Sequence, residues 1–245
     1  MMLHKRWVKI SLVVLVIGYL SFAVKMFAYK SDETICPRIS VTISDAGQLN
    51  FVSREDVQTL LKDKTVYPIG VRLDHIDTDR LENYLKGKSR IKTAECYKTP
   101  NGELRVAVTQ REPILRVKGM YGDYYVDSEL KVMPVSPIFS AYVPIATGFV
   151  NKELALGQLG EFALFLRDHY FWNAQIEQID VARNGEVTLV TRVGDQLVVM
   201  GTLDNYKDKL DRLYALYVNG FNKIGWNKYK QITLKYDGQV VCTKK

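Results

Sequence analysis

The sequence predicts an α+β protein that is anchored in a membrane and carries two folded domains. Three observations support this. An uncharged apolar run near the N-terminus is flanked by basic residues, as in a membrane anchor. The next segment, about 75 residues long, shows the order strand, helix, helix, strand, strand. The remainder alternates short strands with two helical stretches, which predicts a mixed β domain with two helices packed on its sheet.

The apolar run Ile10 to Val24 contains no charged residue. A spanning helix needs about 20 largely apolar residues, and the run reaches this length if Lys25 snorkels and residues 26–29 extend it. We therefore predict a retained single-pass anchor at 10–29. A cleaved secretory signal is the alternative, although Met26-Phe27-Ala28 is a poor cleavage site.

Charge predicts the orientation of the anchor and excludes one class of partner. Residues 1–30 hold five of the 34 basic residues and no acid, so 29 basic residues remain against 27 acidic ones, about +2. By the positive-inside rule the N-terminus is cytoplasmic and the bulk of the chain lies outside the membrane. The later part shows no basic stripe interleaved with aromatic residues, so we expect no nucleic-acid partner.

The first domain is expected at residues 37–112. Its predicted elements are a strand at 39–43, a helix capped by Ser53, a helix that begins at Asp77 or Thr78 and ends at Gly87, and strands at 91–98 and 103–109. The last two strands are joined by Thr99-Pro100-Asn101-Gly102, a hairpin signal because Asn-Gly tolerates positive φ.

The second domain is expected at residues 113–242. Short strands are predicted at 124–126, 131–133 and 143–145, a helix at 152–170, a meander at 176–181, 186–191 and 196–200, and a helix at 203–218. In the last helix the predicted inner residues are Tyr206, Leu210, Leu213 and Tyr217, and the predicted outward ones are Lys207, Lys209, Asp211 and Arg212.

The final predicted strand runs from Ile232 to Tyr236 and continues past Asp237-Gly238 to Cys242. It alternates apolar and polar residues and ends three residues before the C-terminus of the sequence. Terminal strands often lie at a sheet edge, and this one has no proline and little charge to block pairing. We therefore predict a docking edge for another chain.

The sequence offers little catalytic or metal-binding chemistry. Neither His75 nor His169 has a partner at motif spacing, and no nucleophile elbow, phosphate loop or Cys-x-x-Cys is present. The three cysteines, Cys36, Cys96 and Cys242, do not have metal-ligand spacing. Free thiols and a Cys36–Cys96 disulfide are both compatible with the sequence. We expect no enzyme activity, no cofactor and no small-molecule substrate.

Three short motifs follow one another along the chain: Val-Thr-Gln-Arg-Glu-Pro-Ile at 108–114, Tyr-Val-Asp at 125–127, and Leu-Lys-Tyr-Asp-Gly at 234–238. Together they resemble the FtsQ/DivIB family of bacterial division proteins, which have one membrane span, a POTRA domain and a β domain. One departure is that Glu129 and Leu130 stand where many members have a glycine.

The resemblance implies a non-enzymatic scaffold of the divisome in the inner membrane. It binds FtsB-like and FtsL-like bitopic coiled-coil proteins outside the membrane at the division site. In the family an FtsB segment adds to the last strand of the β domain. By this resemblance Tyr236 is the interface tyrosine, Lys235 the cation that meets an acid on FtsB, and Gly238 the glycine that admits a close backbone. Tyr229 and Val240 complete the expected partner-binding set. The alternative role for Lys235 is a charge that protects a sheet edge from pairing with other strands.

The predicted organisation is a cytoplasmic tail at 1–9, the anchor at 10–29, a linker at 30–36, the POTRA domain at 37–112, the β domain at 113–242 and a tail at 243–245. Two other functions are alternatives. A POTRA-type component of outer-membrane protein transport would usually carry several POTRA copies or a barrel. A membrane-anchored envelope hydrolase would need a nucleophile and a base.

Overall fold

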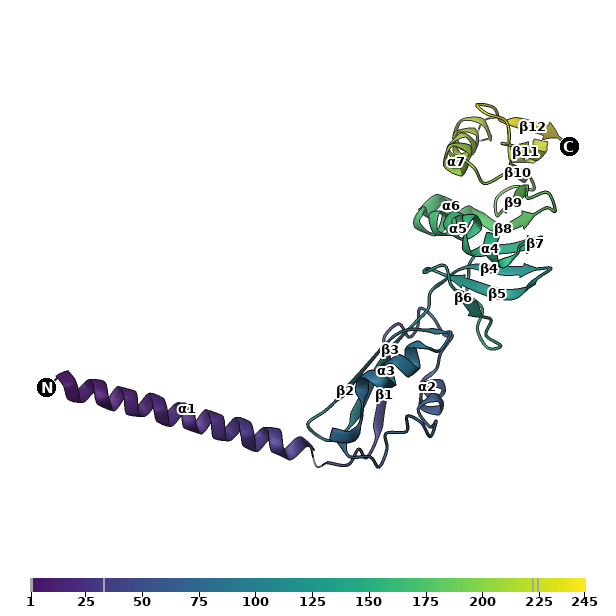
Figure 1. Ribbon diagram of the computed structural model, residues 1–245. Coiled ribbons are helices and arrows are strands. Elements are labelled where there is room, and N and C mark those ends of the chain that lie inside the picture. The colour runs from purple at the N-terminus through teal and green to yellow at the C-terminus, as the bar shows by residue number, and fades with distance from the viewer. Residues whose placement is uncertain (1, 33, 222, 224) are drawn as a thin grey trace. The chain divides into compact units, whose positions relative to one another are not determined.

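The computed structural model describes residues 2–32, 34–221, 223 and 225–245 (Figure 1). The chain divides into two compact units, with the boundary between Gln110 and Arg111. Each unit has its own sheet, and each is described by itself below.

Helix α1 spans Met2–Asp32 and contains the predicted anchor. The described side chains in its middle are mostly exposed, for example Leu12 at 65% and Phe22 at 66%. Among the described residues, no helix combines the length and the apolar character that crossing a bilayer requires. The side chains of residues 10 and 26–29 lie outside the described ones. Membrane anchoring by residues 10–29 therefore stays a prediction.

The first unit has the predicted order of elements. They are β1 (Ile39–Ile43), α2 (Arg54–Leu60), a short 3-10 turn η1 (Leu73–His75), α3 (Thr78–Lys86), β2 (Ile91–Lys98) and β3 (Leu104–Gln110). In the sheet, β3 lies in the middle, parallel to β1 and antiparallel to β2. Both predicted helix starts are confirmed, because Ser53 forms a capping box with Asp56 and Asp77 caps α3.

The cysteines of the first unit are free thiols, and both Cys36 and Cys96 are buried. The Cys36–Cys96 disulfide that the sequence left open is therefore absent. Burial raises the pKa of the Cys96 thiol to about 12, so this thiol is protonated and unreactive at neutral pH.

The second unit is a nine-stranded mixed sheet. Its strands are β4 (Pro113–Gly119), β5 (Gly122–Asp127), β6 (Val132–Pro134), β7 (Ile145–Gly148), β8 (Ile176–Val181), β9 (Val187–Thr191), β10 (Leu197–Gly201), β11 (Tyr229–Thr233) and β12 (Val241–Lys244). The spatial order is β12-β11-β10-β9-β8-β7-β4-β5-β6. The predicted β8–β9–β10 meander is confirmed, whereas β4 was not predicted.

The helices of the second unit pack on one face of its sheet (Figure 1). The single helix predicted at 152–170 is wrong, because the chain forms α4 (Lys152–Leu156), α5 (Gln158–Asp168) and α6 (Tyr170–Gln175). The breaks lie at Gly157 and His169, whose backbones are not helical. The predicted helix at 203–218 is α7 (Tyr206–Ala215), which continues as a π-helical turn η2 (Leu216–Phe221). Buried Phe162, Leu166, Leu210 and Leu213 from these helices meet the inward side chains of the strands.

The turn between β5 and β6 contains Leu130, which stands at a position where the resemblance to the FtsQ/DivIB family implies a glycine. Leu130 has φ +57°, a left-handed conformation that glycine adopts more readily. Asp127 supports this turn, because its carboxylate accepts hydrogen bonds from the amides of Glu129 and Lys131 and forms a salt bridge with Arg111. Asp127 thus has a structural role here.

Candidate docking edge

The terminal strand predicted from Ile232 to Cys242 is two strands. Strand β11 ends at Thr233, and β12 begins at Val241 and folds back antiparallel on β11. In the connection 234–240, Gly238 takes φ +66°, a left-handed conformation that suits a turn, and the side chain of Leu234 is fully buried. The alternation of apolar and polar residues over 232–242 therefore belongs to a hairpin and not to one strand.

The edge of the sheet is β12 and not the strand that contains Ile232. Strand β11 lies between β10, to which it is parallel, and β12. The prediction of an open edge at 232–236 is therefore wrong, because the chain's own backbone covers it. The opposite edge, β6, is three residues long and ends in Pro134, which limits pairing there.

The hydrogen bonds of β11 show which main-chain groups of β12 face outward. The amide of Leu234 donates to the carbonyl of Val199 on β10, so Ile232 and Leu234 point their main-chain groups toward β10 and the intervening Thr233 points toward β12. Thr233 is opposite Val241, and Ile232 is opposite Cys242. The N–H and C=O of Cys242 therefore point away from the sheet. No hydrogen bond to them is found within the described residues.

The five predicted partner-binding residues surround this edge but lie in different settings. Tyr236 and Gly238 are in the connection between the strands, and the Tyr236 side chain is 51% exposed. Lys235 forms an ion pair with Glu186, with Nζ and Oε1 2.8 Å apart. Tyr229 and Val240 are turned inward, because Tyr229 stacks on Phe221 and Val240 packs against the core.

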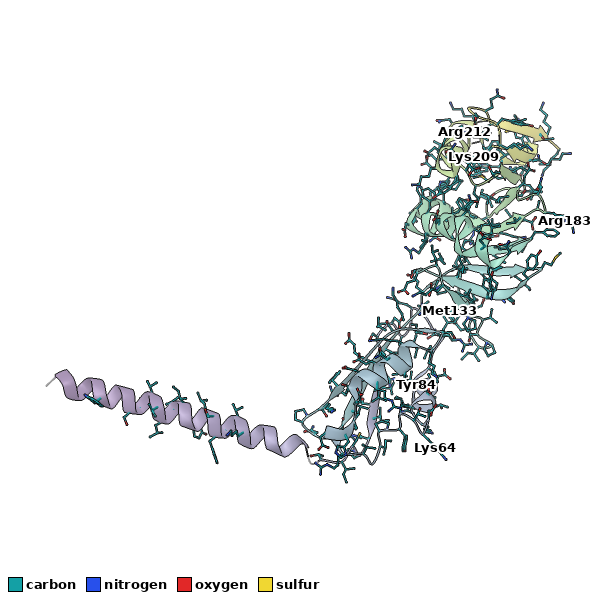
Figure 2. The ribbon with its side chains drawn as sticks, in the orientation of Figure 1. Lys64, Tyr84, Met133, Arg183, Lys209 and Arg212 are labelled. Carbon is teal, nitrogen blue, oxygen red and sulfur yellow. The ribbon has the colours of Figure 1, made fainter. Side chains whose placement is uncertain are left out.

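Two residues of α7 at this site were assigned wrongly from the sequence. Lys209 and Arg212 were predicted to point outward, but Lys209 is only 6% exposed and Arg212 is 16% exposed at its side chain. Figure 2 labels both on α7. The Lys209 ammonium donates to the carbonyl of Thr202, at 2.8 Å, and burial lowers the pKa of Lys209. Arg212 donates to carbonyls of the 234–240 connection.

The surface around β12 is basic. Five lysines lie in the last 18 residues, at positions 228, 230, 235, 244 and 245, and Asp237 is the single acid there. Two of these lysines have acidic partners elsewhere in the unit, since Lys235 pairs with Glu186 and Lys245 with Asp195. The hydrogen bond from Lys235 lowers the pKa of Glu186 and raises that of Lys235. The last 18 residues therefore carry a net positive charge.

A family model described as FtsQ/DivIB, C-terminal related, matches residues 112–243, a little over half of the chain. The chain belongs to the FtsQ/DivIB family. A second model, for a POTRA-like domain, matches residues 34–109. No curated protein matches the chain. The chain is thus a cell-division protein that contains a POTRA-like domain, in a family of non-enzymatic division proteins.

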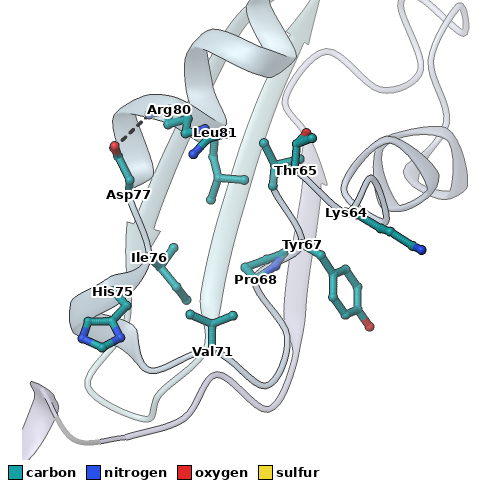
Figure 3. Close-up of a pocket in the computed structure, with 11 residues that line it drawn as sticks. Lys64, Thr65, Tyr67, Pro68, Val71, His75, Ile76, Asp77, Arg80 and Leu81 are labelled. Carbon is teal, nitrogen blue, oxygen red and sulfur yellow. Dashed lines mark hydrogen bonds between the residues drawn. The ribbon is translucent and has the colours of Figure 1, made fainter.

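The POTRA-like domain contains a small cavity of about 190 Å³, shown in Figure 3. Its lining includes Lys64, His75 and Arg80 beside apolar Val71 and Leu81. The Asp77 carboxylate accepts a hydrogen bond from the Arg80 amide, so it is used as a helix cap. Figure 3 shows His75 on the opposite side of this cavity from Thr65 and Lys64.

The FtsQ/DivIB-related domain contains a hollow of about 320 Å³ along β7, β8 and β9. Within its lining, Arg192 forms an ion pair with Glu177 and lies over the ring of Tyr142. In the described part of the chain, no group of three or more His, Cys, Asp or Glu side chains is placed to hold a metal ion. The main-chain edge at β12 is therefore the strongest candidate site.

Proposed function

We propose that this protein is a scaffold of the bacterial division machinery that binds FtsB-like and FtsL-like proteins by strand addition to β12. Residues 10–29 hold it in the inner membrane, with residues 1–9 in the cytoplasm and both domains outside. It links early and late division proteins and performs no chemistry. The exposed apolar side chains in the middle of α1 and the basic residues that precede them support this orientation.

The open main-chain groups of Cys242 carry this proposal. A partner strand that pairs with β12 gains hydrogen bonds that the isolated protein leaves to water. Tyr236, beside the edge, supplies an exposed aromatic ring. Lys235 forms an ion pair with an acidic side chain of the partner. Gly238 leaves the partner room to approach, because a Cβ added there would meet nothing within 4 Å. Tyr229 and Val240 support the edge from inside.

The experiment compares two tyrosines of nearly equal exposure. Tyr236 is 51% exposed beside β12, and Tyr97 is 49% exposed on β2 of the POTRA-like domain. The full-length chain in detergent is titrated with the co-expressed extracytoplasmic segments of the FtsB-like and FtsL-like proteins of the same bacterium. Tyr236→Ala is expected to weaken binding about 30-fold, a loss of about 2 kcal/mol. Tyr97→Ala is expected to leave it unchanged.

Two outcomes would contradict the proposal. The first is unchanged recovery of both partners by Tyr236→Ala combined with Lys235→Glu. The second is a loss of outer-membrane proteins without filaments when the protein is depleted from cells, which would indicate a role in their transport. The proposal predicts filaments with normal amounts of outer-membrane proteins.

A further inference from the structure

The connection between β11 and β12 has few hydrogen bonds of its own. It runs over residues 234–240, and its internal main-chain bond joins the Gln239 amide to the Tyr236 carbonyl, at 3.3 Å. Its first residue is tied to β10 through the bond from the Leu234 amide to the Val199 carbonyl. Between these points the connection contains a glycine with positive φ. Such a segment needs support from outside itself to keep one conformation.

One side chain from α7 supports three main-chain carbonyls of the connection. The guanidinium of Arg212 donates to the carbonyls of Tyr236 at 2.8 Å, Gln239 at 2.6 Å and Leu234 at 3.4 Å. These bonds converge from three points of the connection on one planar group. Arginine suits this role because it presents five N–H donors in a fixed fork, whereas lysine has a single nitrogen.

Arg212 is itself fixed in position. Its Nε donates to the carboxylate of Asp208, one helical turn earlier, at 3.1 Å. The helix that carries it is anchored by Leu210 and Leu213, which are fully buried. The guanidinium therefore connects the rigid core to the terminal connection.

The position of β12 depends on this connection. Strand β12 is paired with β11 through four residue pairs, with an irregularity between Tyr229 and Gln231. A strand this short with one open side is ordered largely by what holds its ends. A partner that binds a disordered edge must also supply the free energy to order it, which lowers its affinity.

We propose that Arg212 is the positioning residue of the docking edge. By holding the carbonyls of the 234–240 connection, it keeps β12 and Tyr236 in the conformation to which a partner strand adds. This inference rests on the proposed function, and it assigns to α7, which makes no strand contact with the partner, control over partner affinity.

The test compares Arg212→Met with Lys152→Met in the full-length chain. Both changes remove one positive charge from the same unit, and Lys152 is an exposed residue at the start of α4. Two properties are measured: amide exchange across residues 234–244, and affinity for the FtsB-like and FtsL-like segments. Arg212→Met is expected to speed exchange in this stretch, leave exchange in β8 and β9 unchanged, and weaken binding about 10-fold. Arg212→Lys should recover part of the affinity, and Lys152→Met should match the original protein.

The outcomes separate the two proposals. If the original protein fails to bind the segments, the proposed function fails and the role of Arg212 in binding fails with it. If the original protein binds them and Arg212→Met binds equally well, or if its amide exchange over 234–244 is unchanged, the positioning role alone is overturned. Faster exchange together with weaker binding supports it. Equal loss of protection throughout the unit would show a general stabilising role and would also overturn it.

Discussion

The edge strands β2 and β12 differ in what bonds to their outer main-chain groups. In the POTRA-like domain, the Thr99 amide donates to the Glu103 carbonyl, so by alternation the Cys96 amide points away from β3. That amide donates to the carboxylate of Glu82 on α3, at 2.9 Å. On β12 the corresponding amide of Cys242 has no such acceptor among the described residues.

This difference shows that position at the edge of a sheet does not by itself make a docking site. Strand β2 is eight residues long and β12 is four, so length alone would favour β2. A side chain from the neighbouring helix occupies part of the longer edge, and Lys86 pairs with that carboxylate at 3.1 Å. We infer that the POTRA-like edge is protected against strand addition and that the β12 edge is left available.

The largest effect is expected from a proline placed at each edge, which tests whether the outward amides of β12 and β2 bind a partner strand. Cys242→Pro removes the outward amide of β12, and proline is tolerated at an edge position whose N–H faces solvent. We expect binding of the FtsB-like and FtsL-like segments to weaken on the order of 100-fold in a titration. Lys98→Pro removes an outward amide of β2 and should leave the affinity unchanged. Strand addition at β12 is contradicted if the Lys98 variant loses affinity and the Cys242 variant keeps it.

Removing the protecting carboxylate tests the other edge. Glu82→Ala leaves the Cys96 amide without its acceptor, and we expect it to lower the free energy of unfolding of the POTRA-like domain by about 1 kcal/mol. Urea unfolding measures this loss, and sedimentation should detect new self-association through the opened edge. Glu95→Ala, an exposed residue on the same strand, is the control and should change stability by less than about 0.5 kcal/mol. Equal effects of the two variants would refute the protecting role.

The same contact gives a smaller pH effect. The hydrogen bond from the Cys96 amide, followed by that from Lys86, lowers the pKa of Glu82 below its usual 4.5. A carboxylate with a lowered folded pKa stabilises the protein above its unfolded pKa, and this contribution is lost as pH falls through the folded value. The stability difference between the original protein and Glu82→Ala should thus be constant above 4.5 and shrink below it. A difference that grows on acidification would contradict this assignment.

The smallest expected effect concerns Lys235. Its pair with Glu186 is exposed, at 39% and 36% for the two side chains, so Glu186→Gln should change the free energy of unfolding by less than about 0.5 kcal/mol. Because the variant frees Lys235 for an acidic partner, we expect affinity to rise about twofold. Glu177→Gln, which breaks the pair with Arg192, serves as the control. Weaker binding by the Glu186 variant would show that Lys235 must be held by Glu186 in order to bind.

Local signals predicted the elements that depend on local contacts. The Ser53 capping box, the Asp77 cap and the Asn101-Gly102 turn lie where the sequence placed them, because each is made within a few residues. The Asn184-Gly185 turn of the meander is of the same kind, and Gly185 has φ +82°.

The errors concern tertiary contacts. Helical periodicity placed Lys209 and Arg212 on the outer face of α7, since the pattern cannot show carbonyls that approach from a distant segment. Alternation across 232–242 predicted one strand, although Leu234 belongs to the core and the chain then reverses. For the same reason the sequence did not indicate that Arg212 donates to carbonyls of the 234–240 connection.

NMR-detected amide exchange of Cys242 and Cys96 in the full-length protein, with and without the FtsB-like and FtsL-like segments, tests strand addition at β12 directly. We expect the Cys242 amide to exchange rapidly in the protein alone and much more slowly in the complex, while exchange of the Cys96 amide, already bonded to Glu82, does not change. An unchanged Cys242 amide in a fully formed complex would contradict strand addition at β12.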